Sequence, residues 1–147
     1  MLLRSDVARK RMFGVAETER LPRDAYTSEV SAQIYAALGD KARHAIAAGH
    51  SAIVDAVFAM PEERRALADI ARQAGVPLHG LFLTADLAVR LQRVGARTGD
   101  ASDADANIIS RQERYHLGAL DWTVIDANGT SEETLRRALT ALATDRQ

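Results

Sequence analysis

The chain has 147 residues, of which 47% are hydrophobic and 27% charged, so it suits one globular domain and is too short for two large ones. Its 19 cationic and 20 anionic side chains give a net charge of −1, and the basic residues are scattered, which argues against a nucleic-acid-binding protein. The absence of cysteine excludes disulfides, thiolate zinc sites and a cysteine nucleophile.

The beginning of the chain resembles neither a signal peptide nor a membrane span. Charges at Arg4 and Asp6 interrupt the first apolar residues, and no run approaches the roughly 18 apolar residues that cross a bilayer. We therefore expect a cytoplasmic protein with no membrane partner. No linker-like segment is evident, so residues 1–147 are expected to form a single domain.

The first half of the chain alternates short apolar runs with helical patterns. Gly49 and Gly75 each follow a helical pattern, which is typical of helix ends, and Pro61 is typical of a helix start. The predicted elements are a strand stub at Leu2-Leu3, a helix at 5–12, a helix from 27 or 28 to 48, a strand at 51–57 and a helix from 61 that ends at Gly75.

The second half continues the same alternation. Its clearest boundary is the capping box formed by Thr130 and Glu133, which begins a helix with a stripe of Leu135, Ala138, Leu139 and Leu142. Before it we predict a strand at 78–84, a helix at 86–98, a polar turn at 99–103, a helix to about 116 and a strand at 122–126.

This order of elements predicts an α/β fold. Short, continuously apolar strands are typical of strands buried on both faces, and alternation with helices indicates right-handed crossovers. We therefore expect a parallel sheet with helices on both faces. Ligands of such sheets bind at the carboxyl ends of the strands, so polar residues there are the first functional candidates.

The first candidate group follows the strand stub and consists of Arg4, Asp6 and Arg9. A carboxylate at this place can accept the proton of a substrate hydroxyl, and arginine side chains can hold an anionic part of the substrate. The alternative is structural: Ser5 or Asp6 caps the helix, and Arg9 is its i+3 partner.

The second candidate group is Asp55, at the end of an apolar run, with Phe58 after it. A carboxylate in this position is typical of sites that hold a Mg²⁺-bound water beside nucleotide phosphates. The alternative is that Asp55 serves the turn alone.

The third group is a cluster of arginines around the polar turn. Arg93 and Arg97 lie one helical turn apart, so their like charges favour a nearby anion. That anion is either phosphate or carboxylate from a ligand, or the acidic turn itself; a solvated charged face is the remaining alternative. The cluster consists of Arg90, Arg93, Arg97, Asp100, Asp103, Asp105, Arg111 and Arg114.

Other chemistries find no support in the sequence. The four histidines, at positions 44, 50, 79 and 116, lack metal-ligand spacing, so no intrinsic metal site is predicted. No Gly-x-Ser-x-Gly elbow or nucleophilic triad is present.

In this order, the features resemble the small P-loop kinases that phosphorylate metabolites, namely the gluconate kinase, chloramphenicol phosphotransferase and zeta-toxin group. The likeness is greatest to the kinase-like ATP-binding domain fused to aminoglycoside-phosphotransferase-like proteins. It is carried by LLRSDVARKRMFGV (2–15), AIVDAVFAMPEERRAL (52–67), LFLTADLAVRLQRVGARTGDASDAD (81–105) and DWTVIDANGTSEET (121–134).

The resemblance implies roles for the candidate residues. Asp6 corresponds to the base or substrate anchor, and Asp55 to the carboxylate that holds Mg²⁺ when nucleotide binds. Substrate contacts fall on Arg4, Arg9 and Phe58. Nucleotide or lid contacts fall on Arg93, Arg97, Arg111 and Asn128, with a small lid at about 93–112. ATP and Mg²⁺ are the cofactors that the family implies, and a small molecule with a hydroxyl group is the substrate.

The chain departs from this family at the phosphate-binding loop. A Gly-x-x-x-x-Gly-Lys-Ser/Thr motif is absent, since Lys10 follows Arg9 and Lys41 follows Asp40, and these are the only two lysines. The chain therefore resembles such a kinase without its first strand, P-loop and first helix. We expect a truncated or degenerate phosphotransferase domain that does not bind ATP alone; the alternative is a non-catalytic binding or interaction module.

The missing strand has a structural consequence. In the related folds it is central, so its absence leaves two strand edges in the middle of the sheet. We therefore expect a rearranged sheet or a homodimer.

Overall fold

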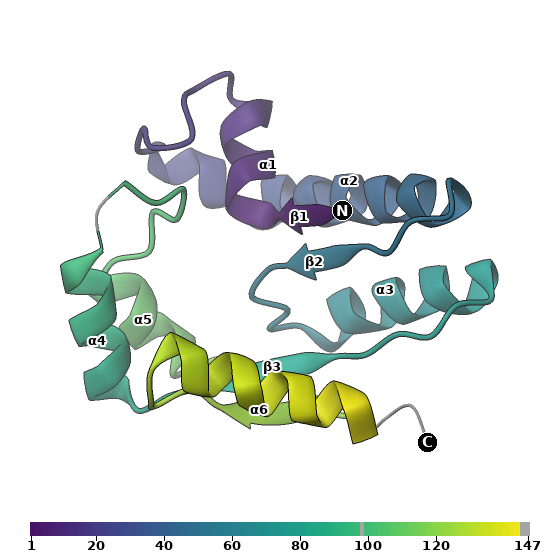
Figure 1. The fold of residues 1–147 in the computed structure, drawn as a ribbon. Helices are drawn as coiled ribbons and strands as arrows, with labels where there is room; N and C mark the ends of the chain where they lie inside the picture. Colours follow the sequence, from purple (N-terminus) through teal and green to yellow (C-terminus); the bar gives the residue numbers. More distant parts are fainter. Residues whose placement is uncertain (98, 145–147) are drawn as a thin grey trace. The chain divides into compact units, whose positions relative to one another are not determined.

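The computed structural model describes residues 1–97 and 99–144, apart from the side chain of Arg111, and it confirms the predicted α/β fold (Figure 1). The helices and strands follow the predicted order, with the three later strands shorter than predicted. They are β1 (Leu2–Arg4), α1 (Ser5–Met12), the 3₁₀ helix η1 (Arg23–Tyr26), α2 (Ser28–Ala47), β2 (Ile53–Asp55), α3 (Pro61–Ala74), β3 (Leu81–Thr84), α4 (Leu87–Ala96), α5 (Ala106–Gln112), β4 (Thr123–Asp126) and α6 (Ser131–Thr144).

The chain divides into two compact units. Unit 1 comprises residues 1–76 with the described part of the turn at 98–103, and unit 2 comprises residues 77–97 and 104 onward. Each unit holds one parallel ladder of two strands, β1 with β2 and β3 with β4. The strands thus pair as two short sheets, and the expected rearranged sheet or homodimer stays a prediction. The single domain with a lid at about 93–112 stays a prediction.

Unit 1 is organised around α2. Thr27 caps this helix, because its side-chain oxygen accepts a hydrogen bond from the Val30 backbone, and Gly49 follows its end with a φ of 79°. Helix α2 packs its apolar side against β1, where Leu3, Ile34, Leu38 and Ala42 form a buried cluster. This cluster supports the β1–β2 ladder from one side, because Leu3 of β1 belongs to it and Val54 of β2 packs against it.

Unit 2 confirms the predicted helix start before α6. The Thr130 backbone donates to Glu133 Oε2 at 2.8 Å, and the Glu133 backbone donates to Thr130 Oγ1 at 3.2 Å. This reciprocal pair satisfies two amide groups that a helix start leaves without partners. Helix α6 packs against β4, where Ile125 is buried.

The prediction that the strands are buried on both faces is wrong. Ile53 is 65% exposed, Leu83 58% and Val124 55%. In unit 1 the reason is one-sided packing: Leu3 and Val54 face the cluster beneath α2, whereas their neighbours Leu2 and Ile53 point to the opposite face and are exposed. Two strands with one covered face leave the other face in water.

The helices give no sign of a membrane span: within 1–97 and 99–144, none is both long enough and apolar enough to cross a bilayer.

Candidate functional site

The carboxyl end of the β1–β2 ladder carries an ion pair. Arg4 ends β1 and Asp55 ends β2, and the register of the ladder makes them partners. Arg4 Nε donates to Asp55 Oδ2 at 3.2 Å. Residues from the first and second candidate groups therefore meet where the two strands end, as parallel pairing requires.

Arg4 has a second carboxylate partner in the turn at 99–103. Its Nη2 donates to Asp100 Oδ1 at 2.9 Å, and this hydrogen bond lowers the pKa of Asp100. The guanidinium thus bridges two carboxylates that lie 45 positions apart in the chain, at residues 55 and 100. The acidic turn serves Arg4 in this way, although the sequence suggested the arginines of α4 as its partners.

Asp6 lies beside this bridge in the first turn of α1. Burial raises the pKa of Asp6, and a hydrogen bond with Ser102 together with the charges of Arg4 and Arg9 opposes that rise. A carboxylate with a raised pKa accepts a proton more readily than an exposed one. The N-cap position is held by Arg4 without a side-chain capping bond, so the interpretation of Ser5 or Asp6 as the N-cap is wrong.

Arg9 is 7% exposed and binds groups of its own chain. Its Nη1 donates to the Ala25 carbonyl at 2.6 Å, and its guanidinium carbon lies 4.8 Å from the centre of the Tyr26 ring. Its Nε has no hydrogen-bond partner among the described residues. In this structure Arg9 therefore ties α1 to η1, and its predicted contact with substrate stays a prediction.

A buried ion pair fastens the acidic turn to α1. Lys10 Nζ donates to Asp103 Oδ1 at 2.7 Å, with side-chain exposures of 1% and 8%. The other oxygen of Asp103 accepts from the Tyr26 hydroxyl and from the Leu21 backbone. Burial alone would raise the pKa of Asp103, but the hydrogen bonds from Lys10 and Tyr26 outweigh it and lower that pKa.

Sequence reasoning missed this anchor. Lys10 and Asp103 lie 93 positions apart, and Tyr26 and Asp103 lie 77 apart, so no local spacing connects them. The one available signal was that Lys10 stands between two arginines in the last turn of a short, polar helix.

The loop after β2 is held in a strained conformation at Phe58. Its φ is 48°, a value that is uncommon for a bulky side chain. Arg64 Nη1 donates to the Phe58 and Ala59 carbonyls at 2.7 and 3.2 Å, and the Phe58 backbone donates to the Tyr35 hydroxyl at 3.0 Å. The Phe58 ring is buried edge-on against Tyr35, and its predicted contact with substrate stays a prediction.

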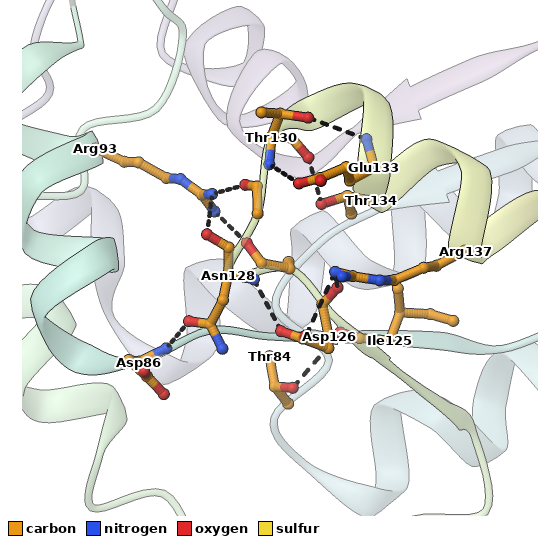
Figure 2. A network of polar contacts seen from close by, with 12 residues as sticks. Thr84, Asp86, Arg93, Ile125, Asp126, Asn128, Thr130, Glu133, Thr134 and Arg137 are labelled. Atoms are coloured by element: carbon orange, nitrogen blue, oxygen red, sulfur yellow. Dashed lines mark hydrogen bonds and ion pairs between the residues drawn. The ribbon is translucent and has the colours of Figure 1, made fainter.

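In unit 2, Arg93 reaches from α4 to the loop after β4 (Figure 2). Its guanidinium donates to the carbonyl of Ala127 at 2.7 Å, to that of Asn128 at 3.3 Å, and to that of Gly129. Sequence reasoning expected an anion to compensate this arginine. Its guanidinium instead donates to backbone carbonyl oxygens, which carry partial negative charge.

Asn128 fixes the same loop by its side chain. Its Oδ1 accepts from the Asp86 backbone at 2.8 Å, and its own backbone donates to Asp126 Oδ1 at 2.9 Å (Figure 2). Arg137 closes the network from α6 by donating to the Asp126 carbonyl at 2.7 Å. The residues predicted beside a nucleotide therefore form a preorganised loop within unit 2.

The two remaining predicted nucleotide contacts are less informative. Arg97 is exposed directly after α4. Arg111 belongs to α5, but its side chain lies outside the described residues.

Asp55 is the residue of this site that suits a metal ligand. In the part of the chain that the structure describes, no three side chains of His, Asp or Glu come together as ligands. Asp55 ends its strand with 60% of its side chain exposed, which fits an oxygen ligand of nucleotide-bound Mg²⁺. These 147 residues contain no Gly-x-x-x-x-Gly-Lys-Ser/Thr loop of the kind that holds the phosphates of ATP.

Replacement of Arg93 by Met should loosen the loop after β4. We expect the amides of Asp86 and Asn128 to exchange with solvent about tenfold faster or more, since each lost hydrogen bond stabilises by roughly 1 kcal/mol. Amide hydrogen exchange followed by NMR measures this. Arg136→Met, at an exposed position of α6, is the control and should leave both rates unchanged. Equal rates in the Arg93 variant and the wild type would show that other contacts hold the loop.

Replacement of Asp103 by Asn should destabilise unit 1 in a pH-dependent way. At pH 7 it leaves the buried Lys10 charge without its carboxylate, at a cost of about 3–5 kcal/mol. Because the folded-state pKa of Asp103 is lowered, its stabilisation is present above the unfolded pKa of about 3.9 and disappears as pH falls through the folded value.

The difference in unfolding free energy between wild type and variant should therefore shrink below about pH 4, as measured by urea denaturation. Asp69→Asn, which removes only an exposed pair with Arg72, is the control and should change stability by less than about 1 kcal/mol. A difference that is the same at pH 7 and pH 3 would rule out the ion pair as its cause.

A family model and a solved structure match this chain. A family model described as an AAA domain matches residues 1–118, whereas no curated protein matches the chain. A solved gluconokinase from Sinorhizobium meliloti 1021 shares the fold, with a TM-score of 0.67 and 19% sequence identity over 97% of this chain and 77% of that one. The chain therefore belongs to the AAA-domain family of this model, and it shares its fold with this gluconokinase.

Proposed function

We propose that the chain is a kinase-like phosphotransferase domain that acts on a hydroxyl group of a small molecule, and that these 147 residues do not bind ATP tightly by themselves. The observation that carries the proposal is Asp6, a half-buried carboxylate with a raised pKa at the carboxyl end of the β1–β2 ladder. Membership of the AAA-domain family and the fold shared with a gluconokinase support the reaction class.

Asp6 would act as the base. Its place in the first turn of α1, next to the Ser102 hydroxyl, leaves it within a polar site rather than in an apolar core. A substrate hydroxyl bonded to this carboxylate would be oriented by it and would lose its proton to it during transfer. Asp55, more exposed, would contribute an oxygen ligand to Mg²⁺ that arrives with a nucleotide.

On the nucleotide side, we assign Arg97, Arg111 and Asn128 to contacts with ATP by resemblance to the family. The loop at 126–130 supports this assignment, since four hydrogen bonds from Arg93 and Asp86 hold it in place before any ligand arrives. Arg93 itself would position that loop rather than touch phosphate.

Neither lysine supplies the missing phosphate contact. Lys10 is buried and paired with Asp103, and Lys41 is an exposed residue within α2. A P-loop lysine must instead stand at the start of a helix, directly after a glycine-rich turn whose amide groups cradle the phosphates. Phosphoryl transfer by this domain would therefore need such a loop from another segment.

A second candidate function is a non-catalytic interaction module that forms dimers or binds a partner. It is favoured by the exposed apolar residues of the first ladder, Leu2 at 62% and Ile53 at 65%. Such a module would bind neither ATP nor a hydroxyl compound, so the experiments below separate the two functions.

Calorimetry with ATP and Mg²⁺ tests the first part of the proposal. We expect no micromolar binding to the 147-residue chain, because no loop of backbone amides and lysine holds the phosphates. A version that also carries a strand, a Gly-x-x-x-x-Gly-Lys-Ser loop and a helix before residue 1 is the matched control and should bind. Micromolar binding by the 147 residues alone would overturn this part.

Asp6→Asn tests the assignment of the base. In the version with the added loop, we expect phosphoryl transfer to polyol acceptors to fall about 10²–10⁴-fold, because the amide cannot take the proton, while ATP binding is unchanged. Coupled measurement of ADP release gives the rate. Asp40→Asn, at an exposed pair with Arg43 on α2, is the control. A rate within about twofold of wild type would exclude Asp6 as the base.

A further inference from the structure

The two arginines expected to bind an anionic substrate are both engaged by the chain itself. Arg4 donates to Asp55 and Asp100, and Arg9 donates to a backbone carbonyl and lies over Tyr26. We propose that the hydroxyl compound accepted at Asp6 carries a positive charge, as an amino alcohol does, and that the site discriminates against anions. This inference rests on the proposed function.

Arg4 already has two anionic partners. Its guanidinium bridges Asp55 and Asp100 at 3.2 and 2.9 Å. Charge-assisted bonds of this kind are among the stronger ones in proteins, so an anionic ligand would have to displace a carboxylate to reach the arginine. A cationic ligand needs no such exchange.

Asp100 is held in place by the turn to which it belongs. It belongs to the turn that Asp103 anchors through the buried pair with Lys10 and through bonds from Tyr26 and Leu21. Asp100 Oδ1 also accepts from the Ser102 backbone at 3.4 Å. The Arg4 bridge is therefore supported by a buried anchor and is not a loose surface contact.

The charged side chains around Asp6 do not cancel one another. Three carboxylates, those of Asp6, Asp55 and Asp100, face the guanidinium groups of Arg4 and Arg9, so the group carries one net negative charge. Arg9 is 7% exposed and the side chain of Arg4 34%, whereas the side chain of Asp55 is 60% exposed. The most exposed charge of the group is thus the negative one of Asp55.

These charges also act on one another. The charge of Asp55 raises the pKa of Asp6, so the two carboxylates lie within electrostatic range. An ammonium group beside Asp55 and Asp100 would relieve that repulsion, while the hydroxyl of the same molecule meets Asp6. An added carboxylate would increase the repulsion.

A matched series of six-carbon probes tests the inference on the 147-residue chain. Glucitol, 1-amino-1-deoxyglucitol and gluconate differ only at the first carbon, which is neutral, cationic or anionic. NMR titration of the Asp6 carboxyl and the Arg4 Nε–H signals gives each dissociation constant. We expect the amine to bind about tenfold more tightly than glucitol, and gluconate to bind most weakly. Gluconate binding as tightly as the amine, or more so, overturns the inference.

Variants locate the selectivity. Asp100→Asn removes one carboxylate and frees one arm of Arg4, so we expect the preference for the amine over gluconate to fall at least about threefold. If this variant does not fold, as judged by its NMR dispersion, Asp55→Asn at the exposed end of β2 should give the same change. Asp69→Asn on α3 is the control and should leave the preference unaltered.

The outcomes also separate this inference from the function on which it rests. If none of the three probes shifts the Asp6 signal, the hydroxyl site itself is excluded, and the inference with it. If they bind without regard to charge, or gluconate binds best, the site stands and the charge selection fails. An unchanged preference in both the Asp100 and Asp55 variants also overturns the assignment.

Discussion

The buried ion pair between Lys10 and Asp103 is the contact on which the arrangement of unit 1 depends. It joins the last turn of the first helix to a turn almost a hundred residues later, and it does so where water barely reaches. A buried charge without its partner is strongly destabilising, so the pair specifies one arrangement of these segments rather than several. The Arg4 bridge and the Ser102 contact of Asp6 both lie on the turn that this pair holds.

Much of the fold could be predicted because its signals are local. Gly75, with a φ of 66°, ends α3 where the sequence placed the end, and the Thr130 capping box begins α6. Helix periodicity and the positions of glycine act within a few residues, so a single sequence contains the information. The sequence also placed Arg4 and Asp55 at the carboxyl ends of strands, although it predicted no contact between them.

The parts that escaped prediction depend on distant residues or on packing. The partners of Asp103 are distributed over α1, η1 and the loop between them, and nothing in their spacing connects them. The like charges of Arg93 and Arg97 predicted a nearby anion. The observed partners of Arg93 are backbone carbonyls, which a pattern of charged side chains does not reveal. The apolar run at 51–57 predicts a strand buried on both faces, but burial also requires a covering layer, and in unit 1 the packed layer lies on the Leu3 side alone.

The burial of Lys10 also determines how the chain responds to amine chemistry. With only two lysines in the sequence and Lys10 at 1% exposure, Lys41 is the one lysine side chain that solvent reaches. Apart from the terminal amine at Met1, which donates to the Ser51 carbonyl, a lysine-directed reagent meets a single target, on the outer side of α2. Within these 147 residues, the fold therefore offers one lysine to a fluorophore or an immobilising linker, and modification of Lys10 as well would report the opening of unit 1.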